Sequence, residues 1–448
     1  MKEELNEIAK SELGVDEKLN EVSITHKYGI VRNTIVENFD QRTWFITDAC
    51  LSVIATLLLE DITNPCGLNI LDSPSTNKTT VLSFFDVEGI TYKSDSFTPA
   101  SFVSHSSNVK EKELPKIDLL PRIQYKCLII PELGPVFQKR REDLIENISV
   151  LTRVFDGQGL ETDSGVRGRR GYKGDYLFAW LGASTPFDFR VWNIMGKFGS
   201  RLLFLTVNDD SSNGSRINKV MAGLTDIQSY KLKAQRCKQV VSDFLEFLWR
   251  NTGGVRKIQW DRAKDNQSLI EVIAKLSNLV AIARSTVSVW REQQTDYNYN
   301  QPIIEHPFRL SSILYNLARG HAIIQGRNQI NAEDIRLVIE VGLSSMPDDR
   351  RQVLNLLLNK EAGDNLKTDE IVEKLGVSNP TARAIMQTFA VLGIVDHNKP
   401  GMGSADSIRL KEDFEWFQGA EFRKLRQQPE RNLSPCKEQE HNEKEIPF

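Results

Sequence analysis

The residues with the clearest chemical potential lie between Asp72 and Thr79, in the run Asp-Ser-Pro-Ser-Thr-Asn-Lys-Thr. A lysine followed by a threonine at the end of such an octet is typical of phosphate-binding loops with the pattern G-x-x-x-x-G-K-[ST]. Lys78 would reach the β- and γ-phosphates, Thr79 would ligate Mg²⁺, and backbone N–H groups would surround the anion. The octet therefore predicts an ATP and Mg²⁺ site at Asn77, Lys78, Thr79 and Thr80.

Two residues of this octet, Asp72 and Asn77, stand where the pattern has glycine. Asparagine tolerates positive φ best among the other residues, so Asn77 costs only a fraction of the ~1–2 kcal/mol that most residues lose there. Asp72 places a carboxylate ~4 Å from a phosphate, which is unfavourable by about 1 to 4 kcal/mol and weakens ATP binding by roughly one to three orders of magnitude. The alternative, a chance Lys-Thr pair in an ordinary strand, loop and helix, stays open on the octet alone.

A strand, a loop and a helix are expected in that order around the octet. Residues 68–71 form a short apolar run suited to a buried strand, and residues 79–85 continue as a helix. Further apolar runs at 127–130, 177–181 and 202–207 alternate with helical patterns and glycine-bearing turns. This spacing predicts an α/β fold with a parallel sheet and crossover helices.

Composition places the chain among soluble globular proteins of two or three domains. It has 448 residues, of which 40% are hydrophobic and 26% charged, and its formal net charge is −3. There is no apolar run long enough to span a membrane and the first residues are too polar for a secretory signal, so we expect a cytoplasmic protein. The five cysteines form no C-x-x-C pair, which favours reduced thiols over disulfides or zinc. With this net charge, any nucleic-acid contact must come from local patches.

Further candidate site residues follow the octet along the chain. Glu132 ends a buried-strand pattern and could polarise a water molecule, although Pro131 stands where an acid would hold Mg²⁺. Thr185 ends the next apolar run and could contact a γ-phosphate. Arg201 immediately precedes a strand, and Arg309 begins a helix. Each of these signals is weak singly, and their order along the chain carries the weight.

The order of these features along the chain is the order of the site motifs of the AAA+ ATPases. Residues 45–345 therefore resemble that family. The segments 151–157, 317–322 and 329–335 are similar to the branch that contains minichromosome-maintenance helicases and enhancer-binding activators, and 94–104 is similar to prokaryotic ATPases of this type.

The resemblance implies a P-loop NTPase (AAA+) parallel sheet with a helical lid, with ATP and Mg²⁺ as cofactors. It also implies a homo-oligomer, either a ring or a filament. Within that oligomer Thr185 would be sensor 1, Arg201 the arginine finger that reaches a neighbouring subunit's nucleotide, and Arg309 sensor 2.

The glycine-rich stretch 157–175 is the best candidate for contact with a polymer. Its glycines permit a tight hairpin, and its positive charge would grip DNA phosphates in the pore of a ring, with Tyr172 stacking on a base. The positive residues are Arg167, Arg169, Arg170 and Lys173. A solvated loop at a subunit contact is the alternative.

Residues 346–417 show a pattern of three helices and two short strands that resembles a winged helix. Pro380 in the first turn of the third helix supports its start at Asn379. That helix would be the recognition helix, and Arg383 in it and Lys399 in the wing would be the DNA candidates. The basic surface is thin, so a protein partner is equally compatible with this module.

Composition shifts divide the chain into five segments: an N-terminal extension (1–44), the nucleotide-binding core (45–207), the helical lid (208–345), the winged helix (346–417) and a tail expected to be disordered (418–448). Two functions remain open for the whole. One is an oligomeric ATPase acting on DNA as a helicase or translocase. The other is a catalytically weak or inactive AAA+-fold regulatory or assembly protein that binds DNA or a protein partner.

Overall fold

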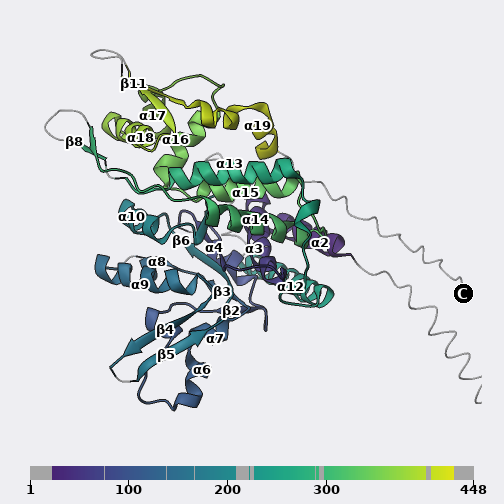
Figure 1. The fold of residues 1–448 in the computed structure, drawn as a ribbon. Coiled ribbons are helices and arrows are strands. Elements are labelled where there is room, and N and C mark those ends of the chain that lie inside the picture. Colours follow the sequence, from purple (N-terminus) through teal and green to yellow (C-terminus); the bar gives the residue numbers. More distant parts are fainter. Residues whose placement is uncertain are drawn as a thin grey trace, which may run out of the picture.

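The computed structural model of the chain describes residues 23–74, 76–137, 139–165, 167–207, 221, 227–287, 289–291, 297–399 and 405–427. A five-stranded parallel sheet lies at its centre, with strand order β2-β3-β6-β1-β7 (Figure 1). The strands are β1 (Cys66–Leu71), β2 (Thr91–Lys93), β3 (Cys127–Ile130), β6 (Ala179–Ser184) and β7 (Leu202–Leu205). All residues of β1, β3, β6 and β7 are buried, as in sheets covered on both faces. The predicted α/β class with a parallel sheet is confirmed.

The apolar runs locate these strands to within a few residues. The run 127–130 coincides with β3, and the run 202–207 contains β7. The run 177–181 begins before β6, which continues to Ser184 because its last residues still pair with β1. The first and last residues of a strand depend on its pairing partners, which the sequence of the strand alone does not show.

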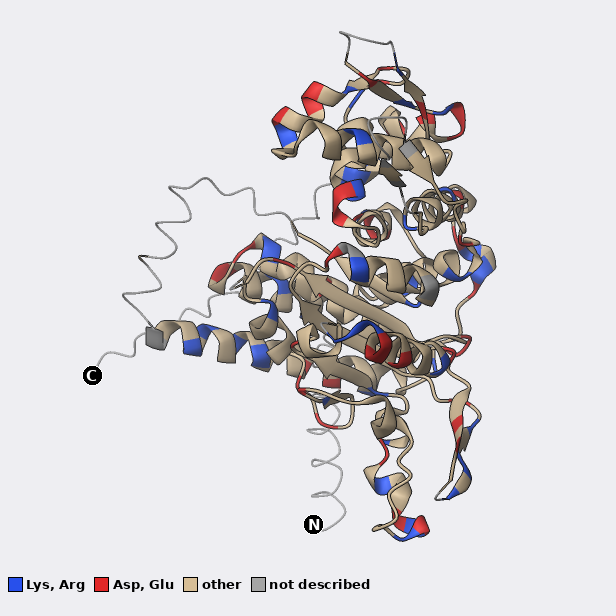
Figure 2. Cartoon of the chain, turned by 90° about the vertical axis from the view of Figure 1, so that its left-hand side faces the viewer, with Lys and Arg blue, Asp and Glu red and all other residues tan. Residues whose placement is uncertain are grey.

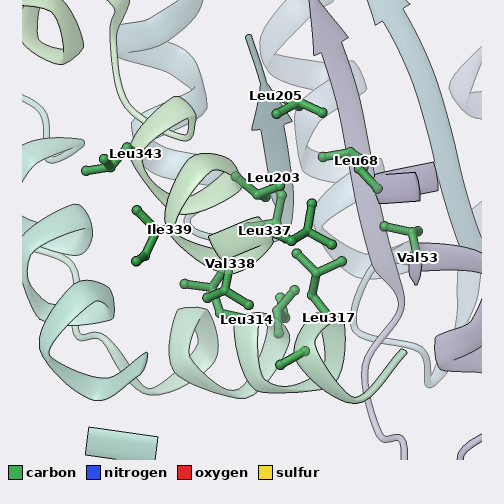
Figure 3. Close-up of a cluster of buried hydrophobic side chains, with 14 of the residues drawn as sticks. Val53, Leu68, Leu203, Leu205, Leu314, Leu317, Leu337, Val338, Ile339 and Leu343 are labelled. Atoms are coloured by element: carbon green, nitrogen blue, oxygen red, sulfur yellow. The ribbon is translucent and has the colours of Figure 1, made fainter. Parts of the chain in front are cut away.

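One face of the sheet packs against α3 (Gln41–Ala55), α14 (Phe308–Ile324) and α15 (Ala332–Ser344). Figure 3 shows leucines of β1 and β7 meeting leucines of α14 and α15 in this core. Within the segment 208–345, which the sequence predicts to be a helical lid, α14 and α15 lie directly on the sheet and share its core. Helix α12 (Ile227–Thr252) packs on α2 (Ile24–Asn38), and α13 (Gln267–Ala283) packs on α14 and α15.

The other face of the sheet contributes to a second, aromatic core. It contains side chains of α9 (Arg141–Val154) and α10 (Phe189–Phe198) together with the inward residues of β3, β6 and β7. The ring centroids of Phe155 and Trp180 lie 5.6 Å apart, and those of Trp192 and Phe204 lie 5.0 Å apart. Such tilted and edge-on pairs add to the stabilisation that burial of the rings provides.

Helix α3 packs against β1, the first strand of the sheet along the chain, and begins at Gln41. Asp40 is its N-cap, and its carboxylate accepts a hydrogen bond from the Thr43 N–H at 2.8 Å, which stabilises the first turn. The helix ends at Ala55 and a 3₁₀ turn, Thr56–Leu58, follows. Arg42 lies in the segment predicted to be an N-terminal extension. In the structure it belongs to the first turn of α3, a helix that packs on the sheet.

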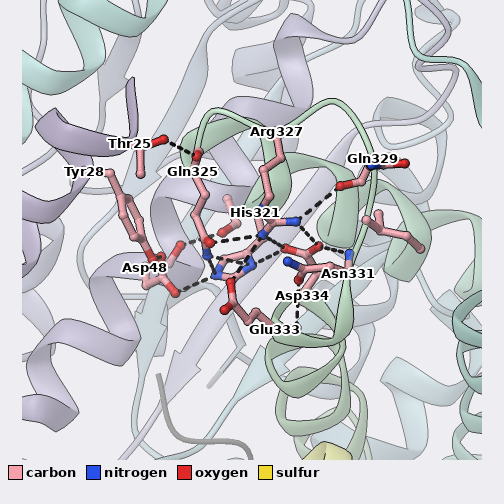
Figure 4. Close-up of polar contacts among 12 residues, drawn as sticks. Thr25, Tyr28, Asp48, His321, Gln325, Arg327, Gln329, Asn331, Glu333 and Asp334 are labelled. Carbon is pink, nitrogen blue, oxygen red and sulfur yellow. Dashed lines mark hydrogen bonds and ion pairs between the residues drawn. The ribbon is translucent and has the colours of Figure 1, made fainter. Parts of the chain in front are cut away.

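A buried polar network joins three of the core helices (Figure 4). His321 of α14 lies between Asp48 of α3, at 2.9 Å from Nε2, and Asp334 of α15, at 2.6 Å from Nδ1. Arg327 also contacts Asp334 at 2.7 Å. Burial alone would lower the pKa of His321, but the two carboxylates outweigh it and raise that pKa to about 10. The imidazolium is therefore held charged in the interior.

The remaining elements of the core region are short helices and two hairpins. The helices are α4 (Lys78–Ser83), α5 (Pro99–Phe102), α6 (Leu114–Ile117), α7 (Leu119–Ile123) and α8 (Gly134–Phe137). The hairpins are β4 (Gly159–Ser164) with β5 (Gly168–Lys173), and β8 (Val289–Arg291) with β9 (Tyr297–Tyr299).

The C-terminal segment forms a small module of helices around a three-stranded antiparallel sheet of order β10-β12-β11. Its elements are α16 (Asp348–Leu358), β10 (Leu366–Lys367), α17 (Thr368–Leu375), α18 (Asn379–Val391), β11 (Val395–Asn398) and β12 (Ser407–Leu410). Helix α19 (Ala420–Gln427) follows, within the segment predicted to be disordered, and packs on α15 with Phe422 and Leu425 buried. Residues 428–448 of that predicted tail lie outside the described residues.

Four cysteines, Cys50, Cys66, Cys127 and Cys237, are free and buried, in agreement with the predicted reduced thiols. Cys436 lies outside the described residues. Burial raises the pKa of the Cys66 thiol to about 12. Among the helices in the described part of the chain, none combines the length and the apolar character needed to cross a membrane.

Candidate functional site

The predicted phosphate loop connects strand β1, which lies between β6 and β7, to helix α4. Asn77 is the N-cap of α4 and adopts φ 62° and ψ 8°, the left-handed conformation. Asn77 therefore adopts the positive φ that asparagine tolerates better than most other residues. Ser75, within the loop, lies outside the described residues.

The Lys78 side chain is buried against the loop itself. Its ammonium donates hydrogen bonds to the carbonyl oxygens of Asp72, at 2.8 Å, and Ser73, at 2.5 Å, and lies 3.2 Å from the Thr76 hydroxyl oxygen. Burial lowers the pKa of Lys78, while the charge of Glu132 acts to raise it. An anion that entered the loop would therefore meet a cation already held at its centre.

Asp72 is compensated by a cation that the sequence did not reveal. The Arg42 guanidinium forms an ion pair with the Asp72 carboxylate and also donates to the Val207 carbonyl oxygen at 2.9 Å. The other carboxylate oxygen of Asp72 accepts the Ser73 N–H at 2.7 Å. The predicted repulsion between Asp72 and a phosphate assumed an unpaired carboxylate, so it overstates the cost. Arg42 lies 30 positions before Asp72 in the sequence, and no motif links the two.

Thr79 and Thr80 occupy the first turn of α4. Thr79 is exposed, which leaves its hydroxyl accessible to a ligand. The Thr80 hydroxyl oxygen lies 2.8 Å from the Tyr230 hydroxyl oxygen, and the Tyr230 hydroxyl donates to Asn77 Oδ1 at 3.1 Å. Tyr230 of α12 thus covers the helix side of the loop, a contact that no motif predicts.

Glu132 and Thr185 lie at the same edge of the sheet as the loop. Strand β6 lies between β1 and β3, with Ser184 opposite Leu71. Thr185 follows β6 directly, and Glu132 follows β3 within two residues, so both reach the carboxyl edge beside the loop. Glu132 Oε1 accepts a hydrogen bond from the Gly134 N–H at 2.9 Å. The structure therefore places Lys78, Glu132 and Thr185 at the same edge of the sheet.

Arg201 and Arg309 lie at the opposite edge of the sheet. Arg201 directly precedes β7, whose first residue pairs with Gly67 near the start of β1. The arginine Nη2 atoms of Arg201 and Arg309 each lie 3.0 Å from the same oxygen, Oδ1 of Asp156. At ~3.3 Å per residue, the length of β1 separates them from the loop by more than 10 Å. They do not reach the phosphate loop of their own chain.

The predicted glycine-rich hairpin forms as β4 and β5, but three of its polar side chains are engaged inside the molecule. Arg170 pairs with the buried carboxylate of Asp118, and the Tyr172 hydroxyl donates to the same carboxylate. Arg167 donates to the carbonyl oxygens of Ser106 and Val109 at 2.9 and 2.6 Å. These contacts join the hairpin to the 104–118 segment and leave the three side chains only partly exposed.

The other two basic residues of the hairpin are exposed and share one acid. Arg169 and Lys173 lie 2.7 and 3.2 Å from Glu161 Oε2. Basic and acidic residues are intermixed along the ribbon in the view of Figure 2. The hairpin therefore offers less free positive charge than its sequence predicts.

The predicted recognition helix corresponds to α18. Arg383 Nε lies 3.4 Å from Asp406 Oδ2, and strands β8 and β9 pack against the helix. Lys399 lies at the exposed end of the β11 strand, near the wing. Helix α18 is therefore contacted by another segment of the chain, while the Arg383 side chain stays 40% exposed.

Comparison with models of known protein families gives no match, and no curated protein matches the sequence. The fold and site by themselves define the class: a mixed α/β protein whose five-stranded parallel sheet is compatible with an α/β nucleotide-binding fold. Such sheets bind ligands outside the carboxyl ends of their strands, which is the edge where the loop after β1 lies.

Proposed function

We propose that the chain is an AAA+-type ATPase that binds ATP with Mg²⁺ at residues 72–79 and acts on DNA as a homo-oligomer. The observation that carries the proposal is the left-handed conformation of Asn77 between the buried strand β1 and a helix that begins with Lys78. A P-loop needs this backbone geometry, and the chain achieves it without glycine.

The surrounding residues fit a nucleoside triphosphate. Lys78 would exchange the carbonyl oxygens of Asp72 and Ser73 for phosphate oxygens, and Arg42 keeps the Asp72 carboxylate from repelling them. The exposed Thr79 hydroxyl is the candidate Mg²⁺ ligand; the ion would neutralise charge that develops during phosphoryl transfer. Glu132 and Thr185 would face the γ-phosphate from the neighbouring strands.

The edge opposite the loop supports assembly with further copies of the chain. Arg201 and Arg309 share one carboxylate there, which leaves a net positive charge. Next to them Ile303 is 82% exposed and Phe308 is 77% exposed. Large apolar side chains exposed beside paired charges are typical of interfaces. A neighbouring subunit that covered them would receive both arginines at its nucleotide.

DNA contact would use the exposed Arg169 and Lys173 of the hairpin and the module 346–417, whose three helices and three-stranded sheet support the resemblance to a winged helix.

The second candidate function, a catalytically weak regulatory protein that binds a protein partner, is favoured by another observation. Glu132 follows Pro131 and already accepts the Gly134 N–H, so it would serve poorly as a base.

Nucleotide binding and phosphate release, each with and without DNA, test the proposal. Lys78→Ala should weaken ATP binding at least tenfold. The control Lys238→Ala removes a surface lysine paired with Asp86 at 3.0 Å and should leave binding unchanged. Equal ATP binding by all three proteins would overturn the nucleotide site. Binding with DNA-stimulated release supports the motor, and binding without release supports the regulatory protein.

A further inference from the structure

A cavity of about 460 Å³ opens beside the phosphate loop, at the carboxyl ends of β1, β6 and β7. Its volume lies within the range of about 300–1,000 Å³ that is usual for small-molecule sites. One wall is the loop itself, through Asp72, Ser73 and Thr76, and the facing wall includes Asp348 and Arg351 of α16. The cavity thus lies between the sheet and the first helix of the C-terminal module.

The loop wall of this cavity is held by two cations. The Lys78 ammonium donates to the carbonyl oxygens of Asp72 and Ser73, and Arg42 pairs with the Asp72 carboxylate. Arg42 also donates to the carbonyl oxygen of Val207, another lining residue. An anionic group of a ligand bound beside the loop would lie close to Lys78 and Arg42.

The residues that line the rest of the cavity differ in character from the loop. Phe187, Trp192 and Met346 supply apolar surface, and Arg351 and Asp348 supply polar groups. Arg351 Nη2 lies 2.6 Å from Asp348 Oδ1, with the Arg351 side chain 9% exposed and that of Asp348 43% exposed. Aromatic and thioether groups favour flat rings, while a carboxylate accepts hydrogen bonds from sugar hydroxyls.

We propose that this cavity holds the nucleoside end of the nucleotide whose phosphates contact Lys78, a step that rests on the proposed function. The base lies against Trp192, Phe187 and Met346. Arg351 donates a hydrogen bond to an acceptor of the base, and Asp348 accepts one from a ribose hydroxyl.

This placement makes the nucleotide a bridge between two parts of the chain. Its phosphates contact the loop after β1, and its nucleoside contacts α16, which packs against α17 and α18 of the C-terminal module. Binding energy at Arg351 and Asp348 then depends on the position of α16, so ligand occupancy and module position are coupled.

Calorimetric titration with two probes, ATP and inorganic tripolyphosphate, separates the two ends of the site. Two variants test the nucleoside end: Arg351→Gln removes the guanidinium, and Thr206→Trp places a large ring in the cavity. Each should weaken ATP binding about tenfold or more and leave tripolyphosphate binding unchanged. Lys360→Gln is the matched control, because this cation pairs with Glu370 at 2.6 Å just beyond α16 and does not line the cavity. Tripolyphosphate binding also shows that each variant is folded.

The outcomes of this titration are distinct. Loss of ATP affinity alone in Arg351→Gln and Thr206→Trp supports the nucleoside site. Unchanged ATP affinity in both variants overturns it, and equal loss for both probes overturns it as well, because the cavity would then hold phosphates. A wild-type chain that binds neither probe would instead refute the proposed nucleotide function itself.

Discussion

The ion pair between Arg42 and Asp72 should decide how well the loop binds ATP, and Arg42→Gln tests this. The substitution leaves the Asp72 carboxylate uncompensated beside the phosphates. A phosphate charge at ~4 Å interacts with it by about 1–4 kcal/mol at effective dielectric constants between those of water and a protein surface. Both side chains keep some solvent contact, being 20% and 11% exposed, so the lower half of this range applies. We expect a loss of about 1–2 kcal/mol, or roughly five- to thirty-fold in Kd.

A double-mutant cycle isolates this effect from other roles of Arg42. Asp72→Asn removes the carboxylate, so Arg42→Gln should then cost less than about twofold, since no unpaired charge remains. Melting temperature must be measured for each variant, because Arg42 also holds the Val207 carbonyl oxygen. Arg190→Gln, which removes an exposed arginine paired with Asp188 at 2.7 Å, is the control. If the losses from Arg42→Gln and Asp72→Asn simply add, the electrostatic reasoning is wrong.

Three further substitutions test the core, the hairpin and the exposed edge. His321 has a folded pKa of about 10, raised from 6.5, so its stabilising contribution is complete below about pH 6.5 and is lost as pH rises through 10; denaturant unfolding at pH 6 and 10 should show that His321→Asn removes this pH dependence. Arg170→Ala should lower the free energy of unfolding by about 3–5 kcal/mol, because it leaves a buried carboxylate unpaired, whereas Arg169→Ala at the exposed pair should leave the melting temperature unchanged. Phe308→Glu should shift a sizing profile toward the monomer without lowering the melting temperature, and an unchanged profile would argue against that edge as an interface.

The local parts of this structure could be predicted from sequence, because they depend on neighbouring residues. Strand β3 coincides with its apolar run, and Asn77 adopts the conformation that its intrinsic preference suggests. The repulsion between Asp72 and a bound phosphate could not be predicted correctly, because Arg42 reaches Asp72 from a helix outside the motif. The hairpin's charge was overestimated for a similar reason: Arg170 is neutralised by Asp118, 52 positions away. Sequence spacing gives no information about such pairs, which form only when the fold brings distant segments together.

The arginines at the amino edge of the sheet provide the sharpest test of how the site would be completed. Parallel strands place the loop at the carboxyl edge, and Arg201 and Arg309 at the other edge meet at Asp156. No rearrangement of side chains within one chain can join the two, because the length of the buried strands separates them. If these arginines act on a nucleotide, they act on that of a neighbouring subunit.

Mixing two inactive variants tests this directly. Lys78→Ala removes the loop cation, and the double variant Arg201→Ala with Arg309→Ala removes both arginines; each should lack ATPase activity alone. In an equal mixture, about one quarter of the interfaces would combine an intact loop with intact arginines, so roughly a quarter of wild-type phosphate release should return. Arginines that act within their own chain would give no recovery. Neither variant changes a residue of the sheet, so a lack of recovery would not be explained by misfolding. It would instead count against action between subunits.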